Sequence, residues 1–498
     1  MKRQLALSLA LFGIATCSVA AVSPEEAAQL GKTLTLFGAI KEGNAEGTIP
    51  AYDGGLRTAP PDFKPDSGFW ADPFRNEKPL FRITSQNMAQ YADKLSEGQK
   101  EILKKYPEYY FDIYPSHRTT AYPKEVLDAT VRNATTCNTQ RDGLAVDPAC
   151  RGGLPFPIPK TGNEVIWNQQ LRYKIGPGYS TTSSSNSWVM DANGQRTKAA
   201  EQATFEEQPY YQPTQADRDP MMYARVYSLN NYPARRSGEV TVLNDYLDPA
   251  AKARRAFSYS PGQRRVKLAP EFAFDTPVAS QGGVTLFDEL QMFSGSQDRF
   301  DYKLVGRKEM FIPYNAYKFY FECNQDEQFL KHHANPACER WELHRVWVVE
   351  ATLKPGKRHV YSKRTYYLDE DTFGIGLYDA WDQSGAVAAG HDCGADGTDP
   401  GLWLGCADGG RHGRAARAGP VLCHPECCRA LHHLHPEHLR SGPHRQRYWL
   451  SFVGLQCRGG RQGREGNAPQ VLDQDRASRA DDRWRGIEEG SGDQLPVL

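Results

Sequence analysis

Residues 341–353 read Trp-Glu-Leu-His-Arg-Val-Trp-Val-Val-Glu-Ala-Thr-Leu, and this stretch sets the fold class. Apolar side chains recur at every second position from Trp341 to Leu353, interrupted by Arg345, and polar residues such as Glu342 and His344 fall between them. A period of two is that of a β-strand. We therefore predict a half-buried strand here, with one face in an apolar core.

Segments of the same kind surround this strand on both sides, separated by turn signals such as Asp191-Ala192-Asn193-Gly194. The further strands are predicted at residues 222–229, 240–247, 254–259, 302–312, 317–321, 360–368 and 374–381. From Glu164 onward the pattern favours strands throughout. Helices are predicted upstream, at 24–37, 86–94, 96–106 (with Ser96 as N-cap) and 123–134. The predicted fold is α+β: one large curved antiparallel sheet, an incomplete β-barrel, with capping helices.

The chain changes composition after Gly385. All 22 lysines lie at or before Lys363, whereas residues 386–498 hold 14 arginines, 8 of the 13 histidines and 6 of the 11 cysteines. A GC-rich gene read out of frame produces such a mixture, which departs from ordinary protein usage. We interpret residues 386–498 as an out-of-frame, disordered tail, and we discount as artefacts its closely spaced cysteines and histidines around Cys423 and His432.

The N-terminus has the pattern of a secretory signal. Lys2 and Arg3 precede an apolar run that is too short to cross a bilayer, and small residues follow it. We expect cleavage near Ala20 or Ala21 and export to the periplasm. The predicted organisation is therefore a signal peptide at 1–21, a helical and loop-rich region at 22–135, the sheet at 136–385 and the tail at 386–498.

The remaining cysteines fall into two close pairs, Cys137 with Cys150 and Cys323 with Cys338. An oxidising compartment favours a disulfide in each pair. A metal site made of Cys323, His332, His333 and Cys338 is the alternative, but its spacing fits no common zinc pattern.

The sequence contains no recognisable catalytic motif, and we predict no enzyme, no cofactor and no metal site. Charge is balanced, with 60 basic and 60 acidic residues, so nothing indicates a nucleic-acid partner. The acidic run Asp369-Glu370-Asp371 lacks the glycine and distal glutamate of a calcium loop, and we interpret it as a hairpin turn. Aromatic residues are abundant in the predicted sheet and its rim. They either pack in the core or line an apolar groove for an acyl chain, and the candidates are Phe156, Trp167, Tyr173, Trp188, Phe311, Tyr314 and Trp347.

Several separated motifs appear in the order of a known family. They are Leu34-Thr35-Leu36-Phe37-Gly38-Ala39, Gly153-Leu154-Pro155-Phe156-Pro157-Ile158-Pro159, Tyr259-Ser260-Pro261-Gly262-Gln263-Arg264, Pro313-Tyr314-Asn315 and Tyr366-Tyr367-Leu368-Asp369-Glu370-Asp371. Over roughly residues 22–385 the chain resembles the exported bacterial proteins grouped as domain of unknown function 1329. That family is similar to the outer-membrane lipoprotein-sorting carriers, which implies an incomplete barrel around an apolar cavity. The resemblance also implies partners such as an RND-type exporter or a fatty-acid-channel-like outer-membrane protein.

Three functions follow as hypotheses. The first is a periplasmic carrier or accessory protein that binds a lipid or another hydrophobic molecule for an envelope transport system. The second is a non-enzymatic interaction or structural protein that docks through the proline-rich rim at residues 155–159. The third is a hydrolase, which would need a histidine with a nucleophile, or paired carboxylates, converging in one cleft.

Overall fold

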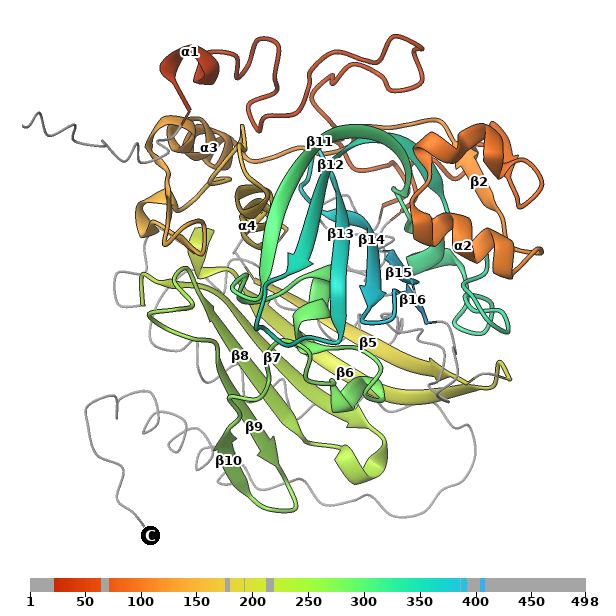
Figure 1. The fold of residues 1–498 in the computed structure, drawn as a ribbon. Helices are drawn as coiled ribbons and strands as arrows, with labels where there is room; N and C mark the ends of the chain where they lie inside the picture. The colour runs from red at the N-terminus through yellow and green to blue at the C-terminus, as the bar shows by residue number, and fades with distance from the viewer. Residues whose placement is uncertain are drawn as a thin grey trace, which may run out of the picture. The chain divides into compact units, whose positions relative to one another are not determined.

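The computed structural model describes residues 22–63, 71–174, 180–191, 193–211, 219–385, 387–391 and 404–407 (Figure 1). The predicted signal peptide and its cleavage site lie outside these residues. Of the predicted out-of-frame tail, only Val387–His391 and Leu404–Ala407 are described, both as strands. Its cysteine and histidine cluster lies outside the described part of the chain.

The predicted strand at 341–353 is confirmed as β12, Trp341–Leu353, and it is central to an eight-stranded sheet. Along one edge β12 pairs with β11, while β13 and β2 share its other edge at opposite ends. The strands of this sheet are β1 (Phe81–Ile83), β2 (Phe111–Tyr114), β11 (Phe300–Pro313), β12, β13 (Tyr361–Asp369), β14 (Ile375–Asp382), β15 (Val387–His391) and β16 (Leu404–Ala407). The parallel pairing of Ile113 with Trp341 joins the N-terminal region to the sheet.

A second, six-stranded sheet contains only neighbours in sequence, in the order β10-β9-β8-β7-β6-β5. Its strands are β5 (Ser180–Met190), β6 (Arg196–Glu207), β7 (Met222–Tyr232), β8 (Val240–Tyr246), β9 (Arg255–Ser260) and β10 (Arg265–Leu268). The prediction of a single sheet is therefore wrong for the described residues. The α+β class is confirmed, and pairing is antiparallel except between β2 and β12; among the described strands, neither strand order closes into a barrel. A separate small hairpin joins β3 (Thr139–Gln140) to β4 (Ala145–Val146).

Two local predictions fail because tertiary packing overrides the pattern. Residues 317–321 do not form a strand, since Lys318–Glu322 is a short π-helix held against the disulfide-bonded loop that follows. The β12 strand is buried on both faces from Trp341 to Val349, and not half-buried, because its polar residues are covered by other parts of the chain.

Three of the four predicted helices are present, close to their predicted bounds. Ser96 caps α2 (Glu97–Lys105) in a capping box: its hydroxyl accepts a hydrogen bond from Gln99 N, and Gln99 Oε1 accepts one from Ser96 N. The helix predicted at 123–134 is α3 (Lys124–Thr136), and the one at 86–94 is a 3₁₀ helix at Met88–Lys94. The helix predicted at 24–37 is only the single turn α1 (Pro24–Ala27), because Gly31 adopts a φ of 82° that no helix accommodates.

The N-terminus of α2 is tied to the sheet by Asp379 of β14. Its carboxylate accepts hydrogen bonds from Ser96 Oγ at 3.0 Å, from Glu97 N and Gly98 N at 3.1 Å each, and from Tyr367 OH at 3.1 Å. Burial nonetheless raises the pKa of Asp379 to about 6, against an ordinary value of 3.8. The folded chain therefore binds this proton more tightly than the unfolded chain does.

A folded-state pKa above the unfolded value means that Asp379 favours folding at low pH. We expect its contribution to be fully present below about pH 4 and to be lost as pH rises through about 6, a change of about 3 kcal/mol at 1.36 kcal/mol per pKa unit. The Asp379→Asn variant carries no titrating group. Urea unfolding of both proteins in steps from pH 4 to 7 should show the difference between their free energies of unfolding changing by that amount, and parallel profiles would contradict the assignment.

One helix that the sequence did not predict occupies the interior. The strand pattern predicted from Glu164 is wrong over its first residues, because Gly162–Leu171 forms α4, begun by the N-cap Thr161. From Glu164 to Leu171 every residue of α4 is buried, the polar ones included, so this stretch has no solvent-exposed face and no amphipathic period. In Figure 1, α4 lies beside β11.

The largest apolar core combines α4 with residues of both sheets. Its members include Val165, Ile166, Trp167 and Leu171 of α4, Tyr223 and Ala224 of β7, Trp347, Val349 and Ala351 of β12, Tyr366 and Leu368 of β13, and Tyr378 and Ala380 of β14. We call this set the inter-sheet core. A second core, packed around α2, contains Phe311, Ile312, Leu343, Val346 and Val348.

Both predicted disulfides are present in the structure. Cys137 bonds to Cys150 with an S–S distance of 2.01 Å, and Cys323 bonds to Cys338 at 2.11 Å. Because both thiols of the second pair are used in this way, the alternative metal site with His332 and His333 is not formed. None of the described helices is long and apolar enough to cross a bilayer.

Candidate functional site in a buried charged network

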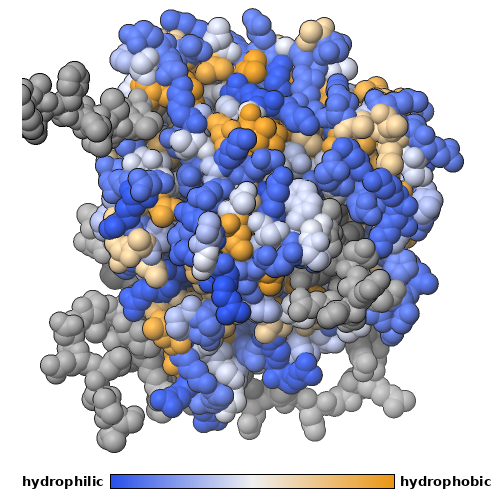
Figure 2. Space-filling model, in the orientation of Figure 1, coloured by the Kyte–Doolittle hydropathy of each residue, from blue (hydrophilic) through white to orange (hydrophobic). Residues whose placement is uncertain are grey.

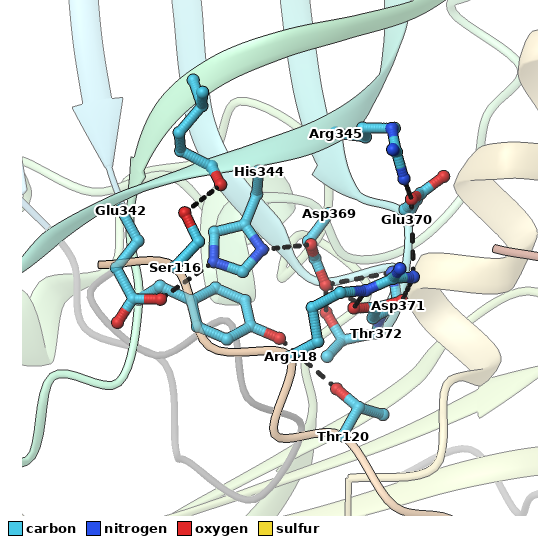
Figure 3. A network of polar contacts seen from close by, with 12 residues as sticks. Ser116, Arg118, Thr120, Glu342, His344, Arg345, Asp369, Glu370, Asp371 and Thr372 are labelled. Carbon is cyan, nitrogen blue, oxygen red and sulfur yellow. Dashed lines mark hydrogen bonds and ion pairs between the residues drawn. The ribbon is translucent and has the colours of Figure 1, made fainter. Parts of the chain in front are cut away.

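The polar residues of β12 that alternate with its apolar ones meet a set of buried charges from distant parts of the chain (Figure 3). Glu342 and His344 of β12 are 0% and 2% exposed. Burial of this kind requires partners for each charge. The partners come from the segment at residues 116–120 and from the turn between β13 and β14.

His344 lies between two carboxylates. Its Nε2 is 3.1 Å from Glu342 Oε2 and its Nδ1 is 3.6 Å from Asp369 Oδ1. The ring also stacks on Tyr314, with 3.8 Å between ring centroids. Burial alone lowers the pKa of His344, but the hydrogen bond to Glu342 and the nearby charge of Asp369 raise that pKa above its ordinary value.

Asp369 begins the acidic turn that joins β13 to β14. Its Oδ2 accepts hydrogen bonds from Asp371 N at 3.1 Å, Thr372 N at 2.9 Å and Thr372 Oγ1 at 3.0 Å. Its Oδ1 is buried without a hydrogen-bond partner. Burial, and then the like charge of Asp371, raise the pKa of Asp369 to about 7. The hairpin turn predicted from the sequence is present.

The other two carboxylates of the turn are held by arginines. Asp371 binds Arg118 through both oxygens, Oδ1 to Nη2 at 2.6 Å and Oδ2 to Nε at 2.8 Å. Glu370 lies 3.1 Å from Arg345 Nη1 and 3.5 Å from Arg307 Nε. These three arginines come from three separate segments, so the turn fixes β11, β12 and residues 116–120 to one another.

The described residues of this network pair buried charges, and they do not place a serine hydroxyl beside His344 as an activated nucleophile. Both ring nitrogens of His344 face carboxylates, and Ser116 donates its hydroxyl proton to Leu343 O at 2.6 Å. The described residues thus show no serine–histidine pair of the kind that acyl transfer requires. What the network offers chemically is a buried imidazole beside two carboxylates, able to hold a proton or a cation.

The seven aromatic residues predicted to bind a ligand do not converge on one site. Phe156, Trp167 and Trp347 belong to the inter-sheet core, and Tyr173 packs against it. Phe311 and Tyr314 belong to the second core. Trp188 is half-buried on β5, with the Arg196 guanidinium 4.6 Å from its ring centroid. Only the first four can therefore share one apolar interior.

The DUF1329 profile, described as protein of unknown function, matches residues 82–391. An uncharacterized protein of Pseudomonas aeruginosa is 40% identical over 385 residues, which is 76% of this chain and 83% of that one. The chain belongs to the DUF1329 family. The resemblance found in the sequence motifs is thereby confirmed.

Solved structures similar to this DUF1329 protein include a family member from Desulfovibrio piger, at 13% identity and a TM-score of 0.28, covering 43% of this chain and 71% of that one. A putative outer membrane lipoprotein-sorting protein domain from Vibrio parahaemolyticus aligns at 11% identity and a TM-score of 0.30, covering 46% of this chain and 75% of that one. A LolA superfamily protein from Nitrosomonas europaea aligns at 9% identity and a TM-score of 0.29, covering 51% of this chain and 89% of that one.

Both halves of the charged network of this DUF1329 chain are visible in its sequence, but only separately. Glu342 and His344 appeared as the polar positions of a strand, and 369–371 appeared as an acidic turn. The pairing of β12 with β13, which sets Val346 opposite Asp369, brings the two halves together. The presence of Glu342 and His344 in an otherwise apolar strand is itself a signal. Buried strands seldom carry two ionisable residues unless these are paired, so the two residues indicate charged partners elsewhere in the chain.

Proposed function

We propose that this DUF1329 protein is a periplasmic carrier or accessory protein that holds a lipid or another hydrophobic molecule for an envelope transport system. The observation that carries the proposal is the inter-sheet core, where α4 packs with apolar residues of the eight-stranded sheet and with Tyr223 and Ala224 of the six-stranded sheet. The N-terminal export pattern and the two disulfides support an oxidising compartment. An exporter or an outer-membrane channel as partner rests on the family resemblance alone.

The inter-sheet core is the interior in which the bound molecule would lie. Burying an acyl chain there would contribute roughly 0.8 kcal/mol per methylene. Because α4 and its neighbours fill this interior, uptake would require α4 to move. On the face shown in Figure 2, hydrophobic residues form separate patches among hydrophilic ones.

Two adjacent residues of β12 provide a matched test. Val349 is fully buried in the inter-sheet core, and Val348, 5% exposed, belongs to the second core. Replacing either with phenylalanine adds the same volume to a buried position of one strand. We expect Val349→Phe to weaken uptake of a fluorescent fatty acid about tenfold, roughly 1.4 kcal/mol, and Val348→Phe to leave it near the wild-type value.

Solvent extraction of the purified chain, followed by mass spectrometry, identifies what it carries. A lipid recovered from wild-type protein, and depleted in Val349→Phe, supports the carrier. The proposal fails if wild-type protein yields no lipid and takes up no fatty acid, or if the two valine variants lose uptake equally.

The second candidate function is that of an interaction protein of the cell envelope, and a different part of the surface would serve it. A small hollow is lined by Val22, Ala134, Cys137, Asn138, Thr139, Pro155, Phe156, Pro157, Ile158, Lys160 and Glu164. The proline-rich segment lies at this hollow, but Pro155, Phe156 and Pro157 are themselves buried, which leaves Ile158 and Lys160 to meet a partner. A photo-crosslinker at Ile158 that captures an envelope protein, from a chain that carries no lipid, would favour this function.

A further inference from the structure

Asp369 differs from the other carboxylates of the buried network in having no arginine. Glu342 pairs with Arg340, Glu370 with Arg345 and Arg307, and Asp371 with Arg118. Among the described residues, the charged side chain facing Asp369 Oδ1 is the imidazole of His344, at 3.6 Å. That oxygen is fully buried and accepts no hydrogen bond. A buried carboxylate oxygen that accepts no hydrogen bond requires an explanation.

The carboxylate of Asp369 is held in one orientation. Three hydrogen bonds to Oδ2, from the backbone of Asp371 and from Thr372, direct Oδ1 toward His344. His344 is also held, since its Nε2 pairs with Glu342 at 3.1 Å. Metal-bound histidines characteristically pair their second ring nitrogen with a carboxylate in this way, which fixes the tautomer and leaves the other nitrogen to bind the ion.

The separation of the two facing atoms suits a shared ion. Zinc binds histidine nitrogen and carboxylate oxygen at about 2.0–2.2 Å, so two ligand atoms in a tetrahedral site lie about 3.4 Å apart. The observed 3.6 Å is close to that value and longer than a hydrogen bond. Asp371 is the candidate for a third ligand: one ligand atom from each of His344, Asp369 and Asp371 lies within 4.8 Å of the others, a limit wider than the tetrahedral spacing, and all three residues are buried.

We propose that His344, Asp369 and Asp371 form a binding site for one divalent transition-metal ion. One imidazole nitrogen and two carboxylate oxygens suit zinc or manganese better than calcium or magnesium, which prefer oxygen ligands alone. Arg118, which holds both oxygens of Asp371, and Glu342 would orient the ligands from outside. The ion would join β12 to the β13–β14 turn, independently of any cargo.

Metal content is the first measurement. The full chain is refolded with zinc chloride, dialysed and assayed by plasma mass spectrometry, alongside His344→Gln and Asp369→Asn. The controls are His359→Gln and Asp379→Asn, which change a buried histidine and a buried carboxylate elsewhere. The tail is the same in all five proteins, so zinc held by its cysteines and histidines cancels. We expect each ligand variant, and neither control, to bind one zinc fewer than the wild type.

A second measurement applies if a ligand variant does not fold. Urea unfolding of wild-type protein with zinc at 100 times its Kd should show the unfolded-to-folded ratio reduced roughly 100-fold relative to the same protein in EDTA. Cobalt in place of zinc should give visible absorption bands that the controls retain. The proposal is overturned if the ligand variants bind as much zinc as the wild type, or if zinc leaves the wild-type unfolding curve unchanged. His344 and Asp369 would then be an ion pair only.

Discussion

Replacing Arg118 with methionine is expected to lower the free energy of unfolding by about 3–5 kcal/mol, the usual result of removing one partner of a buried ion pair. The side chains of Arg118 and Asp371 are 2% and 1% exposed, and two hydrogen bonds join them. Methionine keeps most of the aliphatic volume of arginine. The cost therefore arises from leaving the carboxylate of Asp371 buried and uncompensated, beside Asp369 and Glu370. Urea unfolding followed by circular dichroism measures the change.

The matched control is Lys124→Met, which breaks a pair with Asp128 whose side chains are 84% and 62% exposed. Exposed pairs of this kind contribute at most about 1 kcal/mol. The double variant Arg118→Met with Asp371→Leu removes both charges and should recover part of the lost stability. If Arg118→Met costs no more than Lys124→Met, the buried pair of Arg118 and Asp371 does not stabilise the fold.

Truncating Trp167 to alanine is expected to lower the free energy of unfolding by about 3–5 kcal/mol, because it opens a cavity in the inter-sheet core. Trp167 is fully buried on α4, its Nε1 donates to Gly143 O at 2.8 Å, and its ring lies 6.3 Å from that of Tyr223. Both the apolar contacts and the hydrogen bond would be lost. The midpoint of urea unfolding should fall accordingly.

Trp188 supplies the comparison for this variant. It is half-buried on β5 and its described ring contact is with Arg196, so Trp188→Ala should cost about 1 kcal/mol. Equal losses at the two tryptophans would mean that Trp167 does not stabilise the inter-sheet core. A fatty acid that partly restores the stability of Trp167→Ala would show, in addition, that the inter-sheet core accepts an apolar ligand.

The carrier and metal proposals depend on different contacts of β12. Val349 faces the inter-sheet core, whereas His344 faces the charged network. Val349→Phe should therefore leave zinc content unchanged, and Asp369→Asn should leave fatty-acid uptake unchanged unless the fold itself is lost. Failure of one test does not decide the other.

The features that the sequence predicted correctly are those encoded by neighbouring residues. The strand at 341–353 follows from its period of two, and α2 follows from the capping box of Ser96 and Gln99. The hairpin turn at 369–372 and the family motifs are equally local. Each of these signals spans fewer than about 20 residues, so each can be recognised without knowing what packs against it.

The features that only the tertiary structure decided depend on residues far apart in the chain. Strand periodicity could not separate one sheet from two, because that choice is made by which edges pair. The helix α4 was missed because a helix buried on all sides has no amphipathic period to recognise. Arg118 and Asp371 are 253 residues apart, and His344 meets Asp369 through the pairing of β12 with β13. The sequence thus determined the elements with a local signal, whereas long-range packing decided α4 and brought the buried charges together in the candidate site.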